Sequence, residues 1–318
     1  MHLGSHILVP LDGSPLAQEA LPLGLALGRR HGRAVELVYV HGPPPMPASA
    51  PHVDPRFDRE QRDEMQRWLS ALTEAAAREH GQAVTATFLD GPVARTLEDH
   101  VACRAPALVV MATHGRGGLS RAWLGSVADR LVRHVHVPVL LVRPEPGRVL
   151  GAADAAFRRV LVPLDGSKLA EQAVEPALAL GVPGDVEYTL ITVVEPPRLS
   201  TPSVMMVVAA SETASEAETL AQIGALRQAV AEQYLGHVGA ELRRRGVAVR
   251  THVAVHPQPA QGILEYAATR GADLIAVATH ALGGLARLLV GSVADKVIRG
   301  ASAPVLVVHP ADRKRAGE

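Results

Sequence analysis

The sequence contains one unit twice, and this repeat limits the possible folds more than any other feature. The heptapeptide LVPLDGS stands at residues 8–14 and again, letter for letter, at 161–167. The longer stretch GGLSRAWLGSVADRLVR at 117–133 returns as GGLARLLVGSVADKVIR at 283–299. A chain of 318 residues is long enough for two domains of ordinary size. We therefore predict two copies of one fold.

Each copy reads as alternating strands and helices. In the first copy, short apolar runs predict strands at 6–12, 35–40, 83–91, 107–115 and 138–143. Amphipathic stretches predict helices at 14–32, 57–80, 92–104 and 125–135. The second copy repeats the order, with strands near 159–165, 186–194, 247–255, 273–279 and 304–308. This alternation predicts an α/β fold: two tandem doubly wound domains, each a five-stranded parallel sheet with helices on both faces.

Two connecting segments complete this domain plan. The stretch PEPGRVLGAADAAF at 144–157 joins the copies, so we place the domains at 1–146 and 157–318. The long loop at 195–218 contains the apolar run MMVVAA, and we expect it to fold over a ligand cleft or against a partner. Within this loop, Ser215 and Glu218 have the spacing of a capping box for the helix that follows.

Composition and charge exclude several classes of protein. Lys and Arg balance Asp and Glu at 32 each, and aromatic residues make up only 3% of the chain, so we expect no nucleic-acid partner. No apolar run approaches the roughly 18 residues that span a bilayer, so we expect no membrane partner. The N-terminus leaves no room for a signal peptide, and the single Cys103, expected to be buried, cannot form an internal disulfide. These features predict a cytoplasmic protein.

The loops that follow the first and fourth strands are the candidate ligand site. In open α/β sheets, ligands bind beyond the carboxyl ends of the strands. There the sequence places LDGS and ATHGRGG, followed by Gly125-Ser126 with Ser126 as a suitable N-cap. Glycines that let backbone N–H groups approach an anion, and a helix N-terminus beyond them, indicate a phosphate cradle; an ordinary turn and cap would have the same residues. Neither the P-loop nor the dinucleotide-binding pattern occurs.

Taken together, these residues resemble a known family. The first copy reads Ala112-x2-Gly115-x9-Gly125-Ser126, and the second reads Ala278-x2-Ala281-x9-Gly291-Ser292. An Asp after the first strand of each copy, Asp12 and Asp165, accompanies the pattern. The chain resembles a tandem universal stress protein of the nucleotide-binding type, whose pattern is G-x2-G-x9-G-[ST], over nearly its whole length. The resemblance implies an adenine nucleotide alpha hydrolase-like fold in each copy.

The resemblance also implies an ATP site, with the Mg that the family often keeps among the phosphates. In the first copy it implies binding by Pro10, Asp12, Val40, Met111, Ala112, His114, Gly115, Arg116, Gly118, Gly125, Ser126 and Val127. In the second copy it implies binding by Asp165, Val193, Ala278, Gly291, Ser292 and Val293. It further implies that the two final Pro-Val-Leu strands pair the two halves as a pseudo-dimer, and that two chains associate as a homodimer.

The two copies are not expected to bind equally well. Ala281 replaces Gly115 and Leu282 replaces Arg116 in the second copy. If Gly115 has a positive φ, an alanine at that place costs about 1 kcal/mol or more and shifts the loop. Several residues keep a purely structural interpretation: the two aspartates as turn formers, His114 as a locally packed residue, and Arg116 as a solvated one.

No strong catalytic centre is present in the sequence. There is no G-x-S-x-G elbow and no paired carboxylate beside the cradle, and His134 with His136 does not make a convincing metal pair. We therefore expect an ATP-binding regulatory stress-response protein rather than an enzyme. The alternatives are a nucleotide-independent scaffold of the same family and a slow ATPase. The sequence does not indicate the protein partner or the stress signal.

Overall fold

The chain forms two compact units. The computed structural model describes residues 4–42, 55–113, 124–143, 157–181, 185–198, 201, 205–206, 215–279 and 291–309. Unit 1 holds the described residues up to 143 together with 303–309, and unit 2 holds those at 157–279 and 291–302. Most of the segment predicted to link the copies lies outside the described residues, so the domain boundaries at 146 and 157 stay predictions.

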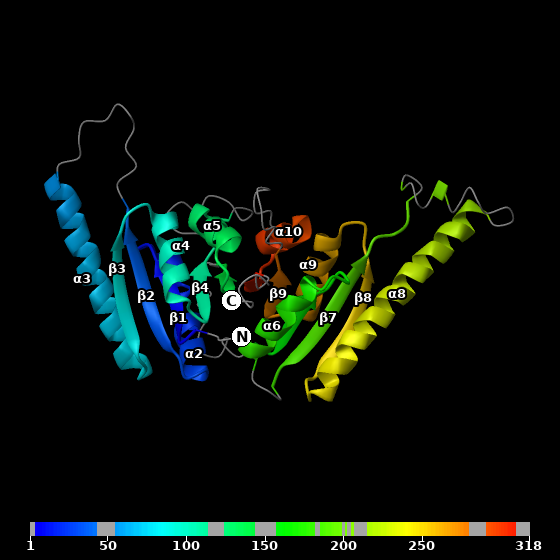
Figure 1. Cartoon of the computed structure of the whole chain (residues 1–318), viewed down its shortest axis with the longest axis horizontal. Coiled ribbons are helices and arrows are strands. Elements are labelled where there is room, and N and C mark those ends of the chain that lie inside the picture. The colour runs from blue at the N-terminus through cyan, green and yellow to red at the C-terminus, as the bar shows by residue number, and fades with distance from the viewer. Residues whose placement is uncertain are drawn as a thin grey trace, which may run out of the picture. The chain divides into compact units, whose positions relative to one another are not determined.

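The sheet of unit 1 runs in the order β3-β2-β1-β4-β5-β10 (Figure 1). Its strands are β1 (His6–Leu11), β2 (Ala34–His41), β3 (Val84–Asp90), β4 (Leu108–Ala112), β5 (Val139–Val142) and β10 (Val305–Val308). Strands β1 to β5 are parallel, as predicted. Strand β10 pairs antiparallel with β5, with Val305 opposite Leu141, so the predicted pairing of the two final strands is confirmed.

Burial explains why these segments form strands. Every residue of β4 and β5 is buried, and both segments consist almost entirely of Val, Leu and Met. Continuous apolar runs of this length suit parallel strands that are covered on both faces. The aliphatic composition of the chain therefore lies mainly in its sheets.

The helices of unit 1 are α1 (Pro15–Gln18), α2 (Leu21–Arg30), α3 (Pro55–His80), α4 (Val93–Arg104) and α5 (Ser126–His134). The single helix predicted at 14–32 is wrong, because the segment forms α1 and α2 with a break between them. Pro22 lies in the first turn of α2, where its missing N–H is tolerated; inside one longer helix it would remove a hydrogen bond and clash with the preceding turn.

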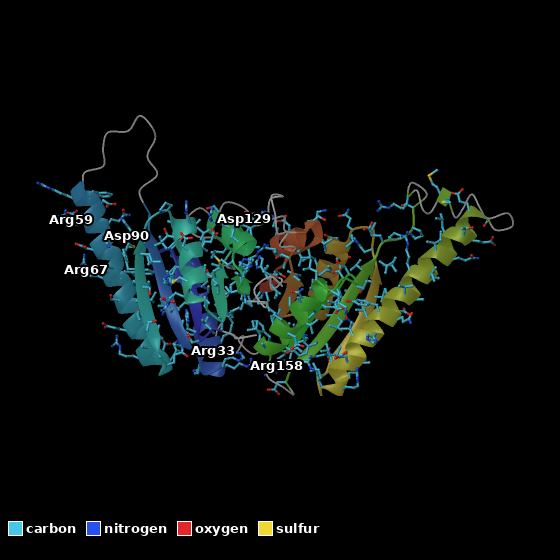
Figure 2. All side chains as sticks on the ribbon, viewed as in Figure 1. Arg33, Arg59, Arg67, Asp90, Asp129 and Arg158 are labelled. Carbon is cyan, nitrogen blue, oxygen red and sulfur yellow. The ribbon has the colours of Figure 1, made fainter. Side chains whose placement is uncertain are left out.

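Helix α3 lies along the edge strand β3 (Figure 1). Arg62 Nη2 donates to Asp90 Oδ2 at 2.7 Å, and Figure 2 shows Asp90 at the carboxyl end of β3. The Arg62 guanidinium also lies 5.5 Å from the ring centre of Phe88, which stacks on Tyr39. These contacts hold the start of α3 against the carboxyl ends of β2 and β3.

Unit 2 repeats this plan. Its sheet runs in the order β9-β6-β7-β8, all parallel, with bounds β6 (Arg159–Pro163), β7 (Glu187–Val194), β8 (Val249–Val255) and β9 (Leu274–Ala278). Its helices are the 3₁₀ helix η1 (Ala170–Ala173), α6 (Val174–Leu180), α8 (Glu216–Arg244), α9 (Pro259–Arg270) and α10 (Ser292–Gly300). The predicted capping box is confirmed: Ser215 Oγ accepts from Glu218 N, and Glu218 Oε2 accepts from Ser215 N at 2.8 Å.

Two further sequence expectations concern the surface. Cys103 is exposed, so the expected burial is wrong. Helix α4 buries Leu97 and Val101 against the sheet, and Cys103 lies roughly 200° around the helix from Val101. Among the described helices, none combines the length and the apolar character that a membrane crossing requires. Met205 and Met206 of the predicted covering loop are exposed, and the rest of its MMVVAA run lies outside the described residues.

Candidate functional site

The carboxyl edge of unit 1 brings the end of β1 next to the end of β4. Ile7 pairs with Leu108 and Leu8 with Val109, so continuing that register places Leu11 beside Ala112. Asp12 follows directly, and its Oδ1 accepts from Ser14 N at 2.8 Å and from Ser14 Oγ at 2.6 Å. Asp12 therefore acts as a turn former through its Oδ1, as the structural interpretation expected. The turn is centred on Gly13, whose φ is 81°.

Ser14 connects this turn to the first helix. Its hydroxyl oxygen accepts from Ala17 N at 3.1 Å and so caps α1. Unit 2 repeats the arrangement with Ser167, whose amide donates to Asp165 Oδ1 at 2.9 Å and whose hydroxyl caps the next turn. The two aspartates differ in exposure, because Asp12 is half-buried and Asp165 is exposed. The carboxylate of unit 1 is thus the more enclosed of the two.

Helix α5 begins at this same edge. Gly125 N donates to Thr113 O at 2.8 Å, which fixes the start of the helix to the residue after β4. Gly125 is therefore the N-cap, with extended ψ, and Ser126 is the first helical residue, so the prediction of Ser126 as N-cap is wrong. Gly125 has no side chain to cap α5, and Ser126 is exposed. Among the described residues, the first amides of α5 thus have neither a helical partner nor a side-chain acceptor.

The other predicted residues of unit 1 supply backbone rather than reactive side chains. Pro10 is half-buried in β1, Val40 is buried in β2, and Met111 and Ala112 end β4 as buried residues. Val127 is the second residue of α5 and is half-buried. The predicted His114, Gly115, Arg116 and Gly118 lie outside the described residues. The described part of the chain therefore brings the turn at Asp12, the end of β4 and the start of α5 to one edge.

The predicted residues of unit 2 lie in matching places. Val193 is half-buried in β7, and Ala278 ends β9. Gly291 is the N-cap of α10, and Ser292 and Val293 are its exposed first residues. Helix α10 likewise has no side-chain cap. The two edges share one backbone plan.

Sequence reasoning missed Tyr234, which distinguishes the edge of unit 2. Its hydroxyl, on α8, donates to Glu171 Oε1 at 3.2 Å, and Lys168 Nζ donates to Glu171 Oε2 at 2.8 Å. Burial, together with the charges of Glu171 and Asp165, raises the pKa of Tyr234 well above its usual value. No sequence motif joins residues so far apart. In unit 1, Gln18 stands at the place of Glu171 and Glu19 at the place of Gln172, so the two units carry this carboxylate one position apart.

One of the two histidines weighed as a metal pair contacts the backbone of its own helix. His134 Nδ1 lies 2.8 Å from Arg130 O within α5. In the described part of the chain, no three His, Cys, Asp or Glu side chains are placed to hold a metal ion.

Comparison with known proteins gives one family for both units. The model of the universal stress protein family matches residues 5–143 and 156–309. A universal stress protein of Mycolicibacterium smegmatis is 27% identical over 314 residues, covering 96% of this chain and 97% of that protein. One from Mycobacterium tuberculosis is 29% identical over 317 residues, covering 95% and 96%. The crystal structure of a universal stress protein from Archaeoglobus fulgidus shares the fold, with a TM-score of 0.66, 18% identity, and coverage of 97% of this chain and 99% of that one. The chain belongs to the universal stress protein family, and the family model matches it twice in tandem.

Proposed function

We propose that this universal stress protein binds ATP at the edge of unit 1 and acts through occupancy of that site rather than through turnover. The observation that carries the proposal is the uncapped start of α5 beside the turn at Asp12. Free N–H groups and the helix dipole favour an anion at a helix N-terminus. The family match and the sequence pattern around Gly125 indicate that this anion is the phosphate chain of ATP.

The described residues could contact both the phosphates and the adenosine of a nucleotide. The amides of Ser126 and Val127 would hold phosphate oxygens, while backbone at Val40 and the carboxylate of Asp12 would face the adenosine. Mg²⁺ would enter with the phosphates, because the described residues form no cation site of their own. When bound, the nucleotide supplies charge and contacts that stabilise the bound form of unit 1 by mass action.

We propose that unit 2 binds ATP weakly or not at all. Ala281 stands where unit 1 has Gly115, and Leu282 stands where it has Arg116. Asp165 is exposed, whereas Asp12 is half-buried. The edge of unit 2 therefore offers a ligand a less enclosed carboxylate and lacks the arginine that could pair with a phosphate.

We also propose that two chains associate as a homodimer, as the family resemblance implies.

We further propose that ATP turnover is slow or absent. Ser14 Oγ donates to Asp12 Oδ1 at 2.6 Å and also accepts from Ala17 N, so this hydroxyl serves as the cap of α1 rather than as an activated nucleophile. A steady-state rate of phosphate release above that of ATP in buffer alone would identify an ATPase instead.

Replacing Ser126 with proline tests the phosphate contact directly. Proline is favoured at the first helical position, so α5 should form normally while losing one amide donor and one hydroxyl. Loss of one hydrogen bond to a charged acceptor predicts about 10-fold weaker ATP binding or more, measured by calorimetric titration of the full chain. Ser126→Ala, which keeps the amide, separates the backbone contribution from that of the hydroxyl.

Ser292→Pro is the matched control, because Ser292 is the first residue of the equivalent α10. Its ATP affinity should equal that of the unchanged chain. Equal affinity in Ser126→Pro and the unchanged chain would contradict the site in unit 1. Titration with cAMP, which is the ligand named for one solved universal stress protein, would show whether a triphosphate is required.

A further inference from the structure

A buried carboxylate lies between the sheet of unit 1 and α4. Glu36 is the third residue of β2 and is 2% exposed. Its Oε1 accepts from Thr87 Oγ1 at 2.6 Å and lies 3.1 Å from His100 Nε2 on α4. From β1, His6 Nε2 lies 3.0 Å from Oε2 without hydrogen-bond geometry, and Arg104 Nε of α4 lies 3.8 Å away. These groups, called here the Glu36 network, join β1, β2, β3 and α4.

The Glu36 network places one buried carboxylate among basic groups. Burial disfavours the ionised carboxylate, but the hydrogen bond from Thr87 and the nearby His100 and His6 outweigh it, so the pKa of Glu36 lies below its usual value. Burial, with repulsion from Arg104 and His100, lowers the pKa of His6 despite the attraction of Glu36. The folded network therefore favours neutral His6. Protonation of His6 in acid adds a buried cation that no second carboxylate of the network offsets.

Unit 2 has no such network at the same place. Strands β2 and β7 have equal length, and the third residue of β7 is Thr189 instead of Glu36. The eighth residue of α9 is Tyr266 instead of His100, and its ring stacks on His252 at 4.5 Å. An uncharged aromatic pair therefore occupies the place of the buried ionic group. The fold does not require the charges.

An ion pair connects α4 to the helix that begins the proposed nucleotide site. Glu98, on α4, accepts from Arg130 Nε of α5 at 2.5 Å. The equivalent residues of unit 2 are Leu264 in α9 and Lys296 in α10, which cannot form this pair. Unit 2 thus lacks both the buried carboxylate between its sheet and α9 and the ion pair between α9 and α10. The two features occur together in the unit that we propose to bind ATP.

We propose that the Glu36 network is a proton-sensitive latch on α4 that, through Glu98 and Arg130, sets how firmly α5 is held for nucleotide binding. The proposal rests on the proposed function of unit 1 and adds its regulation. At neutral pH the network holds α4 against the sheet, and α5 is held with it. In acid, positive charge accumulates in the buried network, α4 loosens, and the amides at Ser126 are less well placed. Acidification therefore weakens ATP binding.

The test compares ATP affinity at about pH 8 and about pH 5, because the pKa of His6 lies below the ordinary histidine value. In the unchanged chain, affinity should fall about five-fold or more beyond the change shared by all variants, the size of a typical coupling between sites. In Arg130→Gln, which breaks the link at the surface and leaves the buried network intact, that excess should fall below about two-fold. Protonation of the ligand and of groups outside the network is common to every variant and cancels.

Arg133→Gln is the matched control. It makes the same substitution on the same helix, but Arg133 pairs with Asp129 of its own helix, labelled in Figure 2, at 2.8 Å. It should keep the pH dependence of the unchanged chain. An equal pH dependence in Arg130→Gln and the unchanged chain would overturn the latch.

Hydrogen exchange separates this proposal from the proposed function. Without nucleotide, the protection of the α5 amides, corrected for intrinsic exchange, should fall about five-fold or more on acidification in the unchanged chain and in Arg133→Gln. The measurement is made in a His309→Gln background, because acid also acts on α5 through His309, which bonds Val132 O. In that background, protection should change little with pH in Arg130→Gln. If ATP does not bind at either pH, the proposed function fails, and the exchange result alone decides the latch. Protection that does not depend on pH in the unchanged chain would overturn it.

Discussion

Replacing Glu36 with alanine is expected to lower the free energy of unfolding of unit 1 by about 3–5 kcal/mol near neutral pH. Removing one member of a buried charged group leaves its partners without compensation: His100 and Thr87 lose their shared acceptor, and His6 loses the carboxylate 3.0 Å from its Nε2. Arg104 can turn toward water, because more than half of its side chain is exposed. The cost should therefore come mainly from the two buried imidazoles and the alanine cavity.

The measurement is urea unfolding followed by tryptophan fluorescence. Both tryptophans, Trp68 and Trp123, belong to the first copy, so the signal reports on that copy alone. The control grafts the arrangement of unit 2, combining Glu36→Thr with Thr87→His and His100→Tyr. Because this removes the charge together with its partner, the graft should recover a large part of the lost stability. A loss below about 1 kcal/mol for Glu36→Ala would contradict the buried network.

Acid is expected to destabilise unit 1 through His309. This residue follows β10, is 5% exposed, and its Nε2 donates to Val132 O in α5. Burial, reinforced by His136 and His134 and only partly offset by that carbonyl, lowers the pKa of His309 from 6.5 to about 4. The folded state therefore favours the neutral ring. The stability is complete above pH 6.5 and is lost as the pH falls toward 4, by about 2.5 kcal/mol at pH 4.5.

His309→Gln isolates this effect. Glutamine keeps a donor near the position of Nε2 but does not titrate, so its stability should fall less by about 2.5 kcal/mol between pH 7 and pH 4.5. His134→Gln is the control, since His134 is partly exposed at the end of α5. The same fluorescence-detected urea titrations at the two pH values supply the comparison. Parallel losses in His309→Gln and the unchanged chain would rule out His309 as the source.

The repeat and its periodicity predicted most of the fold. The alternation of strands and helices follows from the buried apolar runs, the pairing of the last strands follows from the family resemblance, and the capping box at Ser215 follows from local spacing alone. The predicted helix boundaries were wrong where a contact with a neighbouring residue determined where a helix begins. Pro22 lies in the first turn of a second, separate helix, and the carbonyl of Thr113 accepts from the amide of Gly125, so that Gly125 is the N-cap and α5 begins at Ser126, one residue earlier than the expected cap implies.

The polar groups inside the units could not be predicted in the same way. Glu36, Thr87 and His100 lie on three separate elements, and nothing in the local sequence of any one indicates the other two. The same holds for Tyr234 and Glu171. Periodicity identifies which face of a strand or helix is buried, but a buried polar side chain is stable only with partners that the topology brings to it.

The central claim, one nucleotide site in unit 1, is tested most directly by counting bound ATP. Equilibrium dialysis of the full chain with labelled ATP and Mg²⁺ gives the number bound per chain at saturation. We expect one ATP per chain at saturation, with about 10-fold more free ATP needed to reach half of that value in Ser126→Pro and no change in Ser292→Pro. Two per chain would show that the edge of unit 2 binds as well, and none would contradict a nucleotide site altogether.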